Sequence, residues 1–268
     1  MSAPWLYYVF VAASVLYAGA AIGYFLLMGY GSKQAERWSA RVLLTAAILH
    51  VAFIIGDTGR DPQLGDIRQM LSVASFAIVC AQLIALRYGR LAVLGAFTTP
   101  IVLLMFLAAG LGHSVPDVPA DVRTALLPAH VLVNVLGVAA FTLAFAVATA
   151  YLIQERLLRQ RKLSGLFTRL PPLDVLDSLG LKLLLVGFPL FTLGSVSGAF
   201  WAAKLTAVTL SPAQLLGLVA WAVFATVLLL RVAAGWQGRR AAIGTLLGFA
   251  CALAVLIGYA LRAKTGAL

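Results

Sequence analysis

Charged residues are scarce in this 268-residue chain, and acidic residues are scarcer than basic ones. Only 11% of the residues are charged and 62% are hydrophobic, whereas about 25% of the residues of an ordinary soluble domain are charged. This scarcity excludes an ordinary soluble domain and places the chain among membrane proteins. The excess of 20 Lys and Arg over 9 Asp and Glu does not indicate a nucleic-acid partner, because the basic residues stand in short segments between apolar runs.

Cysteine is almost absent as well. The two cysteines, Cys80 and Cys251, both lie within apolar runs, where small buried side chains are expected rather than a disulfide or a metal site. Paired carboxylates, a glycine-rich phosphate loop and a nucleophile elbow are missing. The sequence therefore predicts that the protein is not an enzyme.

Long apolar runs are what the chain has in abundance. A helix needs about 20 mostly apolar residues to cross the hydrocarbon core of a bilayer. Eight runs near that length predict an all-α, polytopic membrane helix bundle of about eight transmembrane helices, forming a single domain over residues 1–268. The predicted spans are Trp5–Met28, Ser39–Gly56, Gln69–Leu86, Leu91–Leu111, Pro128–Ile153, Leu176–Ala202, Pro212–Leu230 and Ala241–Leu261.

The distribution of lysine and arginine predicts how the spans are oriented. If every odd-numbered connection lies in the cytoplasm, thirteen basic residues fall on that side and six on the other. The positive-inside rule then places both termini on the outer, periplasmic side of a bacterial inner membrane. The thirteen residues are Lys33, Arg37, Arg41, Arg87, Arg90, Arg156, Arg159, Arg161, Lys162, Arg169, Arg231, Arg239 and Arg240.

Only three histidines occur, so each can be weighed. His50 lies in the second span, past its middle, where it is either a neutral imidazole bonded to a neighbouring helix or a ligand for haem iron, and the second interpretation is favoured. His130 opens the fifth span and is either a solvated residue at the lipid boundary or an axial haem ligand. His113 lies in an outer loop, where a solvated side chain is the favoured interpretation.

Two other segments are distinctive. Residues 192–204 read TLGSVSGAFWAAK, and their small residues would let a helix approach a neighbouring helix or a flat ligand closely, with Trp201 as an anchor at the outer interface. Close helix packing alone would account for this pattern. Asp174 and Asp177 stand at the start of the sixth span, where the helix dipole favours negative charge, so helix capping is expected to explain both.

Taken together, these segments resemble the CcsA/CcmC/HemX-like family of cytochrome c assembly membrane proteins, especially its eight-span branch without the tryptophan-rich outer motif. Three stretches carry the resemblance and cover roughly the C-terminal half of the chain. They read HVLVNVLGVAAFTLAFAVATAYLIQERLLR from His130, PPLDVLDSLGLKLLLVGFPLFTLGSVSGAFWA over 171–202 and AWAVFATVLLLRVAAGWQGRRAAIGTLLGF over 220–249.

The resemblance implies a membrane component of cytochrome c maturation that binds or handles haem and works with other maturation proteins or apocytochrome c. It implies His130 as the first outer haem-ligand histidine and His50 as a haem ligand within the membrane. The family's tryptophan-rich segment is replaced here by LTAVTLSPAQ over 205–214, and Ser211 and Pro212 stand where a second outer histidine would be expected. A bis-histidine outer site would therefore use His113 or an external ligand.

Two alternatives remain open. The HemX branch implies a membrane regulator that sets the level of a haem-biosynthesis enzyme through basic inner loops, here those with Arg156, Arg159 and Arg161. A small-solute transporter would need broken helices or buried charges near the midplane. Pro100 and Pro189 could break spans, but no span carries a central acidic residue, so transport ranks third.

Overall fold

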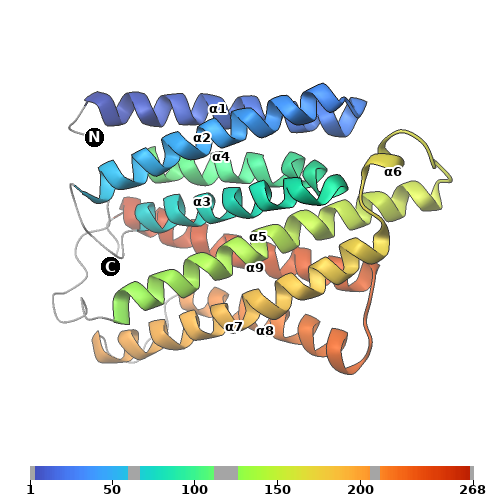
Figure 1. The fold of residues 1–268 in the computed structure, drawn as a ribbon. Coiled ribbons are helices and arrows are strands. Elements are labelled where there is room, and N and C mark those ends of the chain that lie inside the picture. The colour runs from blue at the N-terminus through green and yellow to red at the C-terminus, as the bar shows by residue number, and fades with distance from the viewer. Residues whose placement is uncertain (1–3, 60–66, 112–125, 206–211, 266–268) are drawn as a thin grey trace.

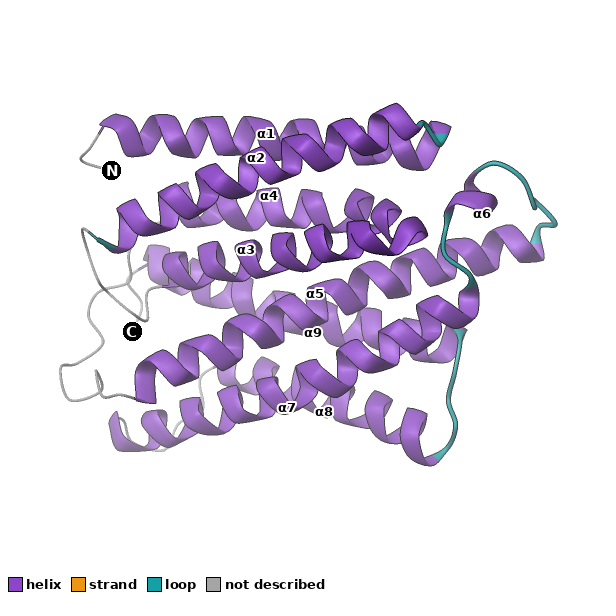
Figure 2. Ribbon diagram, in the orientation of Figure 1, coloured by secondary structure: helices purple, strands orange, loops and turns teal. Residues whose placement is uncertain are grey.

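The computed structural model describes residues 4–59, 67–111, 126–205 and 212–265. Every regular element in these ranges is a helix, as Figures 1 and 2 show. Eight of the helices are long, and a 3₁₀ helix, η1 (Leu86–Leu94), and a single turn, α6 (Leu166–Arg169), lie between them. The long helices are α1 (Pro4–Tyr30), α2 (Lys33–Thr58), α3 (Ile67–Ala85), α4 (Gly95–Leu111), α5 (Leu126–Arg159), α7 (Leu173–Leu205), α8 (Pro212–Ala233) and α9 (Arg239–Thr265).

Seven stretches of the described chain are long and apolar enough to cross a membrane, and they coincide with the first seven predicted spans. The eighth predicted span, Ala241–Leu261, lies within α9, which is helical throughout but is not one of the seven. The predicted all-α, multi-pass membrane bundle is thus confirmed. Helix α1 begins and α9 ends at the same end of the bundle (Figure 1). Which side of the membrane that end faces stays a prediction.

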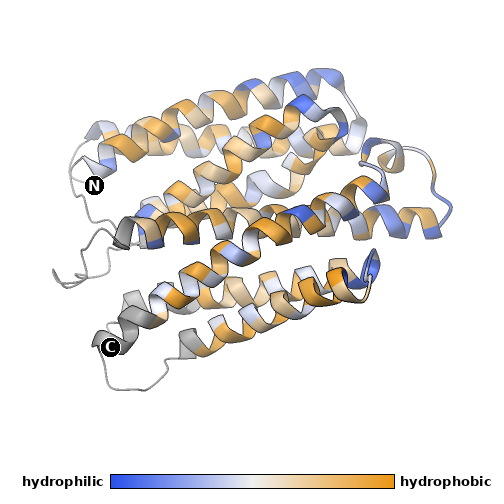
Figure 3. Ribbon diagram, turned by 60° about the horizontal axis from the view of Figure 1, so that its bottom comes forward, coloured by the Kyte–Doolittle hydropathy of each residue, from blue (hydrophilic) through white to orange (hydrophobic). Residues whose placement is uncertain are grey.

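Hydrophilic residues gather at the opposite end, which we call the basic end: the ends of α1, α5 and α8 with the starts of α2, α7 and α9 (Figure 3). Helices α1 to α4 pack together around one large core, and α5, α7, α8 and α9 form a second group. Helix α5 joins them, because it contacts α3 and α4 on one side and α7 and α9 on the other. Cys80 and Cys251 are both free and partly buried, as predicted.

Glycines of α7 line its contact with α5. A Cβ atom added at Gly187 would lie 3.0 to 3.1 Å from Phe141 and Ala140, and one at Gly194 would lie within 3 Å of three Asn134 atoms. A Cβ at Gly180, seven residues before Gly187, would make only ordinary van der Waals contacts, 3.7 Å from Arg231 and 3.8 Å from Val147. Contacts that lie seven residues further along α7 lie about seven residues earlier along α5. This spacing is expected for antiparallel helices packed at a small angle. The glycines let the two backbones approach closely.

The link between α5 and α7 folds back onto the basic end. The Arg169 guanidinium donates to the backbone carbonyls of Met28, at 3.0 Å, and Gly29. These carbonyls belong to the last turn of α1, where no intrahelical donor reaches them. The Gln154 side chain also donates to the Phe167 carbonyl at 3.1 Å, and Leu170 is fully buried. The link is therefore a cap for α1 as well as a connection.

Asp177 differs from the sequence-based expectation. Its carboxylate accepts from Arg231 at 2.9 Å and from the backbone amide of Gly238 at 2.8 Å, so it joins α7 to the end of α8 and the α8–α9 link. Helix capping alone was the wrong explanation for Asp177, because Arg231, with only 4% of its side chain exposed, needs a buried counter-charge. Pro100 and Pro189 lie inside continuous helices, so neither breaks its span.

We expect Gly187→Leu to destabilise the bundle by about 1–3 kcal/mol, because the new side chain meets Phe141 and Ala140 in a packed contact. Gly217→Leu is the matched control, since a Cβ at Gly217 has no atom within 4 Å. Thermal unfolding of the purified protein in detergent measures both. Equal melting temperatures for the two variants would contradict the close α5–α7 contact.

Candidate functional site

His130 lies in the first turns of α5, where the glycine-lined face of α7 passes it. Its Nδ1 atom is 2.7 Å from the Ser197 hydroxyl. A Cβ at Gly198 would lie 3.4 Å from the His130 Cε1 atom, so glycine at this position leaves room beside the ring. The His130 side chain is only partly buried. Residues 192–199 thus provide the close approach predicted from their composition; the side chain of Trp201 lies outside the described part.

The Ser197 hydroxyl has acceptors on its own helix as well as the His130 ring within reach. It lies 2.7 Å from the Leu193 carbonyl and 3.0 Å from the Gly194 carbonyl. A hydroxyl has one hydrogen and can also accept, so it can meet Nδ1 of His130 in either ring tautomer. When the hydroxyl donates to a carbonyl of α7, Nδ1 is the protonated nitrogen and Nε2 carries the lone pair that a metal ligand uses.

Asn134 holds the ring from its other side. Its side-chain nitrogen donates to the His130 backbone carbonyl at 2.8 Å and lies 3.3 and 3.2 Å from the two ring nitrogens. The lone-pair directions of the two ring nitrogens diverge within the plane of the imidazole. The Asn134 nitrogen is at a similar distance from both, so it lies against the face of the ring. Gly194 makes room for this amide. His130 is therefore held by one residue of its own helix and by a small-residue face of α7.

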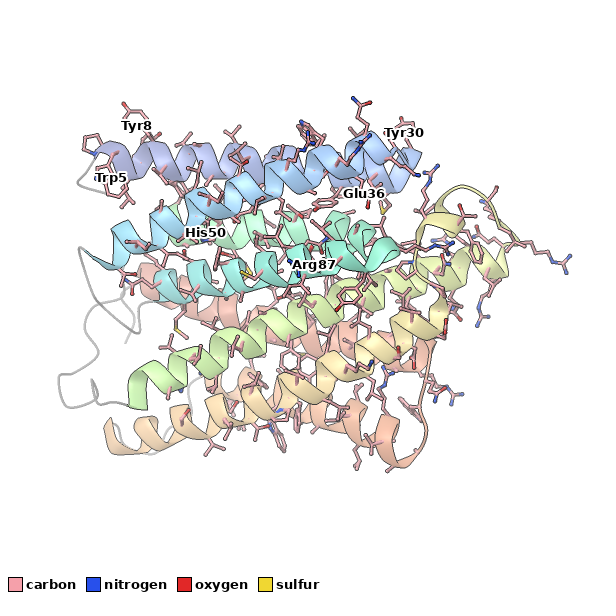
Figure 4. The ribbon with its side chains drawn as sticks, in the orientation of Figure 1. Trp5, Tyr8, Tyr30, Glu36, His50 and Arg87 are labelled. Atoms are coloured by element: carbon pink, nitrogen blue, oxygen red, sulfur yellow. The ribbon has the colours of Figure 1, made fainter. Side chains whose placement is uncertain are left out.

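His50 lies inside the first group of helices, nearer the end at which α1 begins (Figure 4). It is fully buried. Its Nδ1 atom is 2.8 Å from the Tyr17 hydroxyl and its Nε2 atom is 3.0 Å from the Ser72 hydroxyl. The ring also packs against Phe106, with a centroid distance of 4.2 Å, and against Phe76 at 5.5 Å. Both nitrogens are thus engaged, and iron ligation by His50 would require one of these bonds to open.

The structure does not bring the two histidines to one site. The contacts of His50 come from α1, α3 and α4, whereas those of His130 come from α5 and α7. His113 lies outside the described residues. In the described chain no three His, Cys, Asp or Glu residues gather as a metal-ion site would need.

Sequence reasoning missed Asn134 and Tyr17, and it treated Ser197 as a small residue that allows the close approach of a helix or a flat ligand, not as a partner of His130. The signal for Asn134 was present, because an amide four residues after His130 lies on the same helix face inside an apolar span. Tyr17 gives no such signal, since its partner is 33 residues away and tyrosine is common in membrane helices.

The family model described as cytochrome C assembly protein matches residues 8–262. The chain belongs to this family. One relative is cytochrome c biogenesis protein CcsA of Microcystis aeruginosa. It is 28% identical to this chain over an alignment that covers 95% of the chain and 92% of that protein. CcsA of Mesostigma viride is 29% identical over 61% of the chain, an alignment that spans 62% of the Mesostigma protein. Protein HemX of Bacillus subtilis is 26% identical over 91% of the chain and 90% of that protein. No solved structure matches.

We expect Tyr17→Phe to lower the free energy of unfolding by about 1–3 kcal/mol, because it leaves the buried Nδ1 atom of His50 without its partner. Tyr24→Phe is the matched control: the Tyr24 hydroxyl is also buried in α1, but it has no hydrogen-bond partner among the described residues. Thermal unfolding in detergent compares them. If both variants had the melting temperature of the parent protein, the Tyr17–His50 hydrogen bond would contribute nothing to the stability of the fold.

Proposed function

We propose that this protein acts in cytochrome c maturation by binding haem where α5 begins, where His130 Nε2 would hold the iron. The observation that carries the proposal is the 2.7 Å bond between Nδ1 and Ser197, which orients a partly buried imidazole. When Ser197 accepts this bond, Nε2 carries the lone pair that would ligate iron. Family membership supports the same role. Haem, when bound, is the group that the maturation machinery attaches to apocytochrome c.

The described residues fit a flat ligand at this position. An alanine in place of Gly198 would put a Cβ atom 3.4 Å from the His130 ring. Because glycine has no side chain, the face of α7 is flat at this position. Ser197 orients the ring, and Asn134 supports its face. The role is binding and presentation rather than bond making by the protein itself. By the positive-inside rule this end of the bundle faces the periplasm, where apocytochrome c and other maturation proteins meet it.

A second ligand to the iron would be His113 or an external group, because the third histidine of the chain, His50, packs in another part of the bundle. An external ligand would make the bound haem easy to release. We propose His50 as a ligand only in a second conformation, in which its bond to Tyr17 or Ser72 has opened.

Absorption spectra of the purified protein in mild detergent, oxidised and dithionite-reduced, test the proposal. With haem supplied during expression, we expect a Soret band in the parent protein. In His130→Ala the band is expected to be lost, since the iron loses its ligand, and added imidazole is expected to restore part of it. Ser197→Ala is expected to bind haem about 10- to 100-fold more weakly, the usual range for a residue that orients a metal ligand.

Three further variants separate the possible ligands. Ser195→Ala, on the same helix but without a contact to His130 among the described hydrogen bonds, is the control for Ser197→Ala. Loss of the band in His113→Ala would make His113 the second ligand, and retention would favour an external one. Loss in His50→Ala with normal folding would assign haem to the membrane interior. No haem in the parent, or an unchanged spectrum in His130→Ala, would refute the proposed site.

The similarity to protein HemX over 91% of the chain supports a second candidate, a regulator that contacts a haem-biosynthesis enzyme. Such contact would use the exposed arginines at the basic end, for example Arg156, Arg159 and Arg161. Under this alternative, the histidine variants would keep the cellular function, and replacing these three arginines would abolish it.

A further inference from the structure

A cavity of about 600 Å³ opens at the basic end, between the last turns of α5 and the link from α8 to α9. We propose that this cavity binds the phosphate group of an anionic phospholipid. The residues that carry the argument are Tyr151, Glu155 and Arg159 of α5, Trp236 of the link, and Arg239 and Arg240 of α9. The inference is independent of haem binding, because the cavity lies at the opposite end of α5 from His130.

The charges that line the cavity do not balance. Three arginines face one carboxylate, and Glu155 is shared between Arg159, at 2.7 and 3.0 Å, and Arg239, at 4.0 Å. The nearby carboxylate of Asp177 is committed to Arg231 and to the Gly238 amide. A phosphodiester carries one negative charge, and its paired oxygens match the fork of a guanidinium group. A phosphate anion would therefore complete this lining.

The wall of the cavity is built by the fold. Gly235 and Gly238 both have a positive φ, of 64° and 70°, which other residues rarely adopt. A Cβ at Gly238 would also lie 2.8 Å from the Tyr151 hydroxyl. The Gly238 amide is held by Asp177, which is itself paired with the buried Arg231. The link, with this hydrogen bond and these two glycine turns, places Trp236 and Arg239 on the same cavity.

The position of the cavity favours a lipid over free phosphate. It lies where the apolar spans Ala129–Arg159 and Leu215–Ala233 end, which is where lipid headgroups are expected. Tryptophan and tyrosine, here Trp236 and Tyr151, prefer that interface. The helices that lead away from the cavity into the membrane expose apolar side chains, against which acyl chains can pack; these are Leu229, Val232, Ile243 and Leu247. Basic pockets between helices at the cytoplasmic face commonly hold anionic headgroups.

Thermal unfolding in a neutral detergent tests the proposal, with phosphatidylglycerol, phosphatidylcholine or inorganic phosphate added at equal concentrations. We expect phosphatidylglycerol to raise the melting temperature of the parent well above the effect of phosphatidylcholine, with inorganic phosphate close to the buffer alone. Native mass spectrometry of the same samples gives the number of lipids bound. A response to inorganic phosphate equal to the lipid response would overturn the assignment to a lipid.

The variant R239Q/R240Q removes two of the three cavity arginines and is expected to weaken phosphatidylglycerol binding about tenfold or more. R161Q/K162Q is the matched control: it removes the same charge from the same end of the bundle, outside the cavity. Arg159→Gln, on the exposed end of α5, is a second variant that tests the cavity if the first does not fold. Equal losses in the cavity and control variants would overturn the site, because general attraction to a basic surface would then explain the binding.

Discussion

The contact between α5 and α7 is the constraint on which the candidate site depends. Inside a bilayer, helices gain little from excluding water from one another, so they associate through close packing and a few polar bonds. Gly187 and Gly194 of α7 provide that packing against α5. The same register places Ser197 against His130. The orientation of the His130 ring is therefore a consequence of how α5 and α7 pack. A shift of one helical turn would separate these two residues and leave a polar side chain of each helix facing lipid.

Polar groups inside the described helices are held in small sets that span several elements. Tyr17, His50 and Ser72 join α1, α2 and α3, and Asp177, Arg231 and Gly238 join α7, α8 and the following link. With no water in the hydrocarbon core, an unpaired member of either set would cost far more than at a surface. The first set sits in a core of aromatic rings and the second near a membrane surface, yet both fix the relative positions of three segments.

Much of the fold could be predicted from the sequence, because hydrophobic runs as long as a bilayer is thick admit few structures. The spans, the free cysteines and the close approach at residues 192–199 followed from composition alone. Which residues meet across helices could not be predicted in the same way. Asp177 seemed to need only a helix dipole, but Arg231 lies 54 residues away and was counted among the loop charges. For His50 the depth in the membrane was apparent, whereas its two hydroxyl partners depend on how α1 and α3 rotate about their axes.

Arg169 has a consequence for the order in which the bundle is completed. The carbonyls of Met28 and Gly29 leave the ribosome about 140 residues before the guanidinium that caps them. During synthesis, this end of α1 is therefore left to water or to lipid headgroups until five spans have been made. The first four helices share a core of their own, but they acquire this closure only from the second half of the chain. If the chain were divided between α4 and α5, the two fragments would have to associate before Arg169 could cap the end of α1.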